Sequence, residues 1–88
     1  KVKLLRDTVS SLRLDSVLSV GFSLSRSKAA EAVTSGKVQV NWADWQKPDR
    51  QVVQGDVLTL RGLGKCVLEE VGNQTKKGRV FITVKRYL

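Results

Sequence analysis

The sequence predicts a single α+β domain in which two short helices pack on a small antiparallel sheet of four to five strands. In the first half of the chain apolar residues recur at helical spacing, whereas from residue 37 onward apolar and polar residues alternate as on half-buried strands. The chain has 88 residues, which is enough for one modest hydrophobic core and too few for two. We therefore expect one domain over residues 1–88.

The two helices are predicted from their apolar spacing and from residues that commonly begin and end helices. A helix over about residues 12–20 would have Ser11 as its N-cap and Gly21 as the left-handed residue that ends it. A second helix would begin at the N-cap Ser25 and stop at Gly36. Its apolar face consists of small residues, which allow close packing. The two helices should form a compact corner.

The strands are predicted from alternation and turn residues. In residues 37–42 the apolar side chains alternate, and this parity places Trp42 in the core. The segment 43–50 contains the only proline and should be a connecting loop with a short strand around Trp45. Residues 1–9 could be either a strand or an extended lead-in. Further strands are expected over residues 57–61, 65–71 and 79–87, with turns at 55–56 and 72–78.

Net charge is the strongest compositional signal. Sixteen Lys and Arg residues against eight Asp and Glu residues give a formal charge of +8 and an isoelectric point near 10.2. On so small a protein this produces a positive potential over much of the surface, and nucleic acid is the first partner to consider. The alternative is that the basic charge serves solubility alone. Particular residues therefore have to distinguish this alternative from nucleic-acid binding.

Several classes of function are disfavoured by residues that the sequence lacks. There is no histidine and Cys66 is the only cysteine, so we expect no internal disulfide, no metal-ligand cluster and no Ser-His-Asp or Cys-His arrangement. No apolar run approaches the roughly 20 residues of a membrane span, and no signal peptide is evident. We expect a cytoplasmic protein that is not an enzyme, without catalytic residue, cofactor, metal or small-molecule substrate. Because the chain begins at Lys1 rather than Met, it is expected to be a fragment of a longer protein.

The start of the second predicted helix is the strongest candidate binding site. A helix N-terminus exposes free backbone N–H groups and about half a positive charge, which together favour an anion. Ser25, Arg26, Ser27 and Lys28 place two hydroxyl groups and two cations there. Stability alone favours Asp or Glu in a first helical turn, so the cations indicate an external anion such as a phosphate. The alternative is that Ser25 is an ordinary cap beside solvated charges.

Other basic and polar residues could extend this site. Asp15 is expected to lie near enough to Arg26 to brace it. Lys37 and Asn41 would share the outward face of the first strand after the helices. The sequence "RGLGK" lacks the spacing of a nucleotide-binding loop and is expected to be a strand bend or hairpin turn. The candidate flanking contacts are Arg13, Lys37, Asn41, Lys47, Arg61 and Lys65.

Two groups of residues allow two interpretations each. Lys76, Lys77 and Arg79, which we call the secondary basic cluster, are either a second nucleic-acid contact or a solvated edge that discourages strand pairing. Trp45 and Tyr87 either stack on unpaired bases or complete the small core.

The segment "RLDSVLSVGFSLSRSKAAEAVTSGKVQVN", with "KP" and "GDVLTLR" downstream, resembles the S-four RNA-binding domain, also called the α-L motif. The resemblance covers a core motif of about residues 12–61 and leaves a C-terminal β-hairpin extension of about residues 65–87. It implies that RNA lies against the helix corner and the adjoining strand. Many members have Gly where Trp42 stands. The sequence looks closest to the C-terminal domain of YlmH-type and photosystem II S-four proteins of bacteria, cyanobacteria and plastids, where a basic residue is common at the position of Leu63.

Residues and resemblance together predict a monomeric, non-catalytic module that binds structured RNA, either ribosomal RNA or tRNA, in a ribosomal context. Its compartment would be the cytoplasm, or the plastid stroma in a plant or alga. One alternative is an accessory RNA-binding domain of an RNA-modifying enzyme such as a pseudouridine synthase. The other is a basic protein-binding module.

Overall fold

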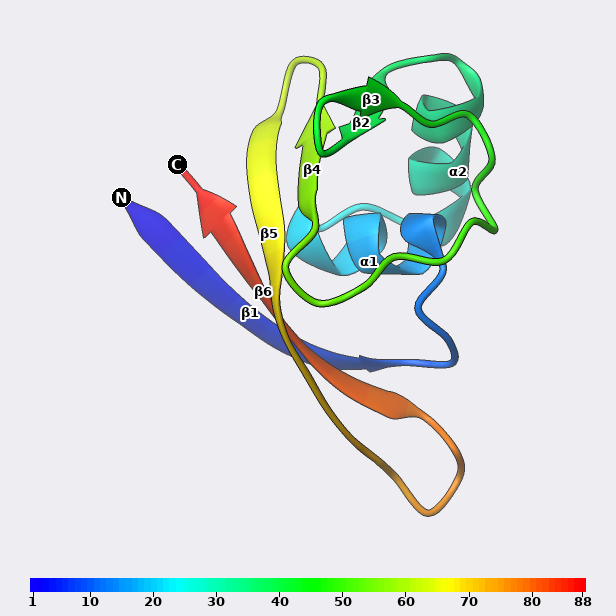
Figure 1. Ribbon diagram of the computed structural model, residues 1–88, viewed down its shortest axis with the longest axis vertical. Coiled ribbons are helices and arrows are strands. Elements are labelled where there is room, and N and C mark those ends of the chain that lie inside the picture. The colour runs from blue at the N-terminus through cyan, green and yellow to red at the C-terminus, as the bar shows by residue number, and fades with distance from the viewer.

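The computed structural model describes all residues, 1–88, and has two helices packed on one face of a six-stranded antiparallel sheet (Figure 1). The strand order across the sheet is β1-β6-β5-β4-β2-β3. Neither helix has the length and apolar composition that crossing a bilayer requires. The elements are β1 (Val2–Val9), α1 (Leu14–Gly21), α2 (Arg26–Thr34), β2 (Val38–Val40), β3 (Ala43–Asp44), β4 (Val57–Leu60), β5 (Gly64–Gln74) and β6 (Val80–Tyr87).

The predicted α+β class is confirmed, and the sheet has one or two strands more than predicted. The first nine residues, which the sequence left undecided, form the edge strand β1, paired with β6 from Val2↔Tyr87 to Val9↔Val80. The short β3 lies at the opposite edge. β5 and β6 extend beyond the helices as a long hairpin, which projects from the body of the domain (Figure 1).

The start of α1 differs from the prediction, because Arg13 rather than Ser11 is the N-cap and its side chain makes no capping bond. The loop between β3 and β4 caps the helix instead. The N–H of Leu14 donates to the carbonyl of Arg50 at 2.9 Å, and the N–H of Asp15 donates to the carbonyl of Pro48 at 3.1 Å. These bonds satisfy donors that a helix start otherwise leaves free.

The end of α1 also differs from the prediction. Gly21 is the last helical residue and does not have a positive φ, and the chain turns instead at Ser23, with φ 55°. Gly21 is needed because the helix lies against the sheet there. A Cβ atom on Gly21 would lie 2.8 Å from Cys66 Sγ and 3.1 Å from Val84 Cγ1. The glycine therefore permits close helix–sheet packing rather than a left-handed turn.

α2 begins and ends as predicted. Ser25 is its N-cap, and the helix is followed by Gly36 with φ +79°. Ala29 and Val33 are fully buried, and α2 packs against α1. This packing holds α2 in place with its first turn at the surface.

Trp42 does not lie in the core, and the prediction from strand parity was wrong. β2 ends at Val40, and Asn41 (φ 50°) and Trp42 (φ 67°) form a two-residue turn to Ala43, the strand partner of Val40. Two consecutive positive φ angles are typical of a type I′ hairpin turn, so the alternation ends before Trp42. The tryptophan side chain is 68% exposed.

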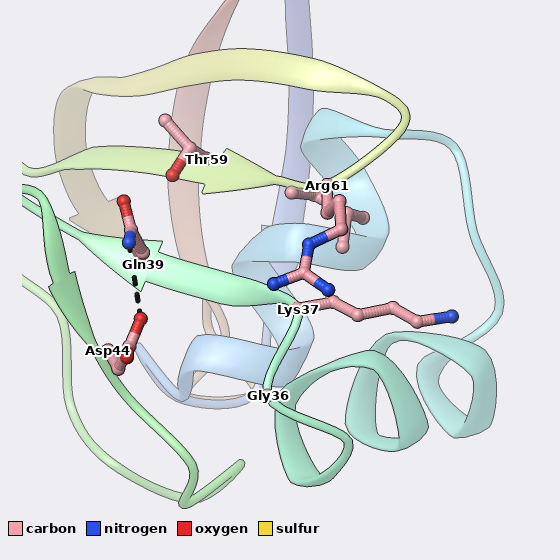
Figure 2. A pocket seen from close by; sticks show the side chains of 7 residues that line it. Gly36, Lys37, Gln39, Asp44, Thr59 and Arg61 are labelled. Carbon is pink, nitrogen blue, oxygen red and sulfur yellow. Dashed lines mark hydrogen bonds between the residues drawn. The ribbon is translucent and has the colours of Figure 1, made fainter.

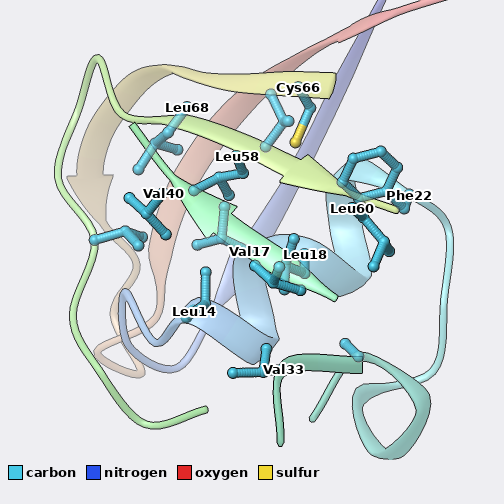
Figure 3. Close-up of a cluster of buried hydrophobic side chains, with 14 of the residues drawn as sticks. Leu14, Val17, Leu18, Phe22, Val33, Val40, Leu58, Leu60, Cys66 and Leu68 are labelled. Carbon is cyan, nitrogen blue, oxygen red and sulfur yellow. The ribbon is translucent and has the colours of Figure 1, made fainter. Parts of the chain in front are cut away.

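The hydrophobic core fills the space between the two helices and the sheet (Figure 3). Leu14, Val17 and Leu18 of α1 face Leu58 and Leu68 of the sheet, and all five are fully buried. Cys66 lies in the same layer, and burial raises the pKa of its thiol to about 12. A thiol in this state has little thiolate at neutral pH, so Cys66 acts as a core residue.

Candidate nucleic-acid interface

The first turn of α2 is open to solvent and carries the features predicted from the sequence. Ser25 Oγ accepts a hydrogen bond from the N–H of Lys28 at 3.2 Å and lies 3.3 Å from Ser27 Oγ. The N–H groups of Arg26 and Ser27 have no acceptor within the protein. No acidic residue lies in this turn. The helix end thus offers two free N–H donors, hydroxyl groups and two exposed cations to an anion.

The start of α1 cannot serve in the same way. Its first N–H groups are bound by the carbonyls of Arg50 and Pro48, as described above. Its first turn also contains Asp15, whose negative charge occupies the place that an anion would take. Of the two helices, only α2 therefore presents an anion-binding N-terminus.

Asp15 connects the two helices through an ion-pair cluster with Arg13 and Arg26. The Arg13 guanidinium donates from Nε and Nη2 to the two carboxylate oxygens at 3.0 Å each, and Arg26 Nη2 donates to Oδ2 at 3.3 Å. The expected contact with Arg26 exists, although Arg13 makes the two shorter bonds. Burial alone would raise the pKa of Asp15, but the two arginines outweigh it and hold the pKa below its usual value.

Replacement of Asp15 by asparagine should lower the free energy of unfolding by about 1 kcal/mol at neutral pH, because both arginines stay partly solvated. The folded protein binds fewer protons than the unfolded chain near the ordinary Asp pKa of 3.8. The stabilisation by Asp15 is therefore present above that pH and is lost as the pH falls through the folded pKa. Urea denaturation of both proteins at about pH 7 and about pH 3 tests this linkage. An equal difference at both pH values would contradict it.

Basic side chains continue from α2 onto the sheet, and we call Arg26, Lys28, Lys37 and Arg61 the basic track. Lys28 and Lys37 line one shallow depression of about 240 Å³ together with Glu31. Lys37 and Arg61 line the next, of about 220 Å³, where the Arg61 guanidinium points toward Lys37 (Figure 2). The structure thus brings Lys28, Lys37 and Arg61 together along one surface, and Arg26 lies at the start of the same helix with its guanidinium bound to Asp15.

The loop that caps α1 adds Lys47 to this region. Lys47 is exposed and precedes Pro48, whose carbonyl binds the N–H of Asp15, so it lies close to the cluster of Arg13 and Asp15. No pattern in the sequence singles out Arg50, yet its guanidinium lies 3.8 Å from the centroid of the Trp45 ring. The half-buried Trp45 packs on the core, and Arg50 covers part of its outer surface.

Asn41 is placed differently from its prediction as an outward contact on the strand. It lies in the β2–β3 turn, and both ends of its amide bind within the protein. Asn41 Nδ2 donates to Asp56 Oδ1 at 2.9 Å, and Asn41 Oδ1 accepts from the N–H of Val57 at 2.9 Å. Asn41 therefore joins two turns, and each end of its exposed amide retains one free hydrogen-bonding position.

Lys65 and Tyr87 lie on the face of the sheet opposite the helices. The Lys65 ammonium is 4.5 Å from the centroid of the Tyr87 ring, and the Lys85 ammonium is 5.7 Å from it. Lys65 follows the hairpin turn that the sequence predicted for "RGLGK", with Gly62 at φ +88°. Tyr87 is 39% exposed, and its ring is already in contact with cations.

The three residues of the secondary basic cluster do not lie together in the structure. Lys76 and Lys77 are exposed in the turn of the β5–β6 hairpin, at the end that projects away from the helices (Figure 1). Arg79 folds back instead, and donates from Nε to Thr8 Oγ1 at 2.9 Å and from Nη2 to the Thr8 carbonyl at 2.8 Å. The two lysines are therefore separate from the basic track, whereas Arg79 lies against β1.

Comparison with known proteins shows what the chain is similar to. The family model described as the S4 domain matches residues 12–58, which is more than half of the chain. The chain is also similar to a curated Bacillus subtilis (strain 168) protein named ribosome-associated protein quality control protein P2, with 41% identity over 85 residues. That match covers 97% of this chain and 33% of the relative, so the chain spans about a third of the relative's length.

Proposed function

This chain belongs to the S4 domain family, and we propose that it is a non-catalytic module that binds structured RNA through its phosphate groups. The open N-terminus of α2 would hold one phosphate with backbone N–H groups, Ser25, and the side chains of Arg26 and Lys28. Lys37 and Arg61 would hold phosphates further along the same strand of RNA. The resemblance in the sequence predicted this family, and the family-model match confirms it.

A single observation carries the proposal, namely that the α2 N-terminus is open while that of α1 is closed. A free helix start that has two cations and no carboxylate in its first turn is unfavourable for the isolated protein. An external anion would reverse this cost. The basic track contains several cations over α2 and the sheet, which suits a polyanion better than a single small anion.

The class of RNA is inferred from the relative. Its name describes a ribosome-associated protein, so we propose ribosomal RNA or tRNA in a ribosomal context as the partner of this chain. Folded RNA presents phosphates at fixed spacing, which a rigid surface can recognise with little reading of bases. We expect the chain to act as a monomer in the compartment where translation takes place, the cytoplasm or the plastid stroma.

The salt dependence of RNA affinity tests the mechanism. If the surface neutralises ~4–6 phosphates, a plot of log affinity against log salt concentration should have a slope of about −3 to −5. Fluorescence anisotropy with a labelled, folded RNA fragment at several KCl concentrations would measure it. An affinity that does not change with salt would contradict electrostatic binding.

Two alternatives remain open for the same surface. The chain could serve as the RNA-binding part of an RNA-modifying enzyme such as a pseudouridine synthase, and its match to only a third of the relative leaves room for further domains. The surface could also bind an acidic protein. A pull-down from cell extract in which added RNA fails to displace a bound protein would favour that second alternative.

A further inference from the structure

A third depression, of about 270 Å³, lies between the end of β1, the side of α1 and Arg79. It is separate from the two depressions of the basic track. Most of the side chains that line it are polar, and they include Ser10, Ser16 and Ser19. At about 30 Å³ for each water molecule of liquid, the space is large enough for a phosphate group with several waters.

Ser16, in the lining of this depression, has a buried hydroxyl group without a partner. The residue is only 2% exposed, and its Oγ atom has no hydrogen-bond partner. The neighbouring Ser19 hydroxyl donates to the Ser16 carbonyl at 2.6 Å and so does not satisfy the Ser16 hydroxyl. A buried hydroxyl without a partner is costly, and a rotation of the Ser16 side chain toward the depression would let it donate to an acceptor there.

Two guanidinium groups line the same space. Arg79 is held by its two bonds to Thr8, which use Nε and Nη2 and leave Nη1 free. Arg26 is held by one bond from Nη2 to Asp15 and keeps its other donors. The only carboxylate in the lining is that of Asp7, whose Oδ1 accepts from the N–H of Thr8 at 2.7 Å. The depression thus has a net positive charge and an excess of donors.

We propose that this depression binds a phosphate group of the RNA backbone, with Arg79 and Arg26 as its cations and the Ser16 hydroxyl as a buried donor. The inference rests on the proposed function and extends it. Arg26 borders both the first turn of α2 and this depression, so a strand of RNA that leaves the α2 phosphate can continue past Arg26 to Arg79. The footprint would then include β1 and the start of β6, beyond the region that the family model matches.

Titration with inorganic phosphate tests the site without RNA. Saturable shifts are expected in the amide NMR signals of Ser16, Ser19 and Arg79, and they should be strongly reduced in S16A and in R79Q. S16A should fold normally, since removing an unpartnered hydroxyl breaks no bond. K77Q is the matched control, because Lys77 lies in the same hairpin turn and outside the depression. Absent shifts, or shifts that neither variant changes, would overturn the site.

RNA binding tests whether the phosphate belongs to a polynucleotide. R79Q should weaken the affinity for folded RNA about tenfold, as expected for loss of one charge-assisted contact. It should also reduce the salt slope by about 0.7–0.9, and K77Q should leave that slope nearly unchanged. If phosphate binds but R79Q keeps the wild-type slope, the site takes free phosphate and the RNA assignment is wrong. If phosphate binds but no folded RNA does, both RNA assignments fail and the anion site alone remains.

Discussion

Replacing Arg26 and Lys28 together with alanine should weaken binding to folded RNA by about 100-fold at low salt. Each side chain is expected to make a charge-assisted contact to phosphate, worth about 1.5–3 kcal/mol, and 1.4 kcal/mol corresponds to a factor of ten. Both lie at the open start of α2, where the helix N–H groups point toward the same phosphate. Fluorescence anisotropy with wild-type and variant proteins at one salt concentration measures the loss.

The matched control is the double replacement of Lys76 and Lys77 with alanine. It removes the same net charge and therefore changes the long-range field equally, but it acts at the far end of the β5–β6 hairpin (Figure 1). We expect a loss of only a few-fold. Equal losses in the two double variants would show that the binding surface lies elsewhere. Circular dichroism checks the fold, and Lys28→Ala alone avoids disturbing the bond from Arg26 to Asp15.

The site at α2 was predictable from the sequence because its determinants are local. Ser25 caps the helix with a bond that spans three residues, and Gly36 follows the helix with a positive φ that glycine adopts readily. Neither feature depends on a distant segment. The cations of the first turn of α2 follow Ser25 directly in the sequence. The structure therefore places the start of α2 and its cations as the sequence predicted.

Features that depend on distant segments were predicted wrongly. Ser11 was a reasonable N-cap by composition, but carbonyls of residues 48 and 50 reach α1 and remove the need for a side-chain cap. Asn41 resembled a strand residue, yet its amide is bound by Asp56 and Val57 in another turn. Asparagine at the first position of a two-residue turn was the available signal. The large side chain of Trp42, at a position that favours glycine, concealed it.

The depression lined by Ser16 and Arg79 could not have been predicted from the sequence. Arg79 was grouped with Lys76 and Lys77 because the three are close in sequence, whereas its two bonds to Thr8 join residues 71 positions apart. Ser16 has nothing distinctive in the sequence, and only its buried position leaves its hydroxyl without a partner. Charge patterns give the number of cations, but the fold decides which of them share one anion.

The second large effect concerns the packing that holds α1 on the sheet. Gly21→Ala should lower the free energy of unfolding by about 2 kcal/mol, although alanine is favoured over glycine in a helix by about 1 kcal/mol. The new Cβ would lie 2.8 Å from Cys66 Sγ, and Cys66 is fully buried in the core. For a domain of this size the loss corresponds to a fall of roughly 8–16 °C in melting temperature, measurable by circular dichroism.

A double-mutant cycle with Cys66→Ala shows whether this contact is the cause. Removing Sγ leaves an ordinary contact to the Cβ of residue 66 at 3.5 Å and the contact to Val84 Cγ1 at 3.1 Å, which a shift of a few tenths of an ångström relieves. In the Cys66→Ala background, Gly21→Ala should therefore cost less than about 1 kcal/mol. Costs that simply add would contradict the packing explanation. Because α1 carries Asp15 and so positions Arg26, Gly21 supports the proposed RNA-binding surface without being part of it. RNA affinity of Gly21→Ala should remain near that of the wild type at temperatures where the variant is folded.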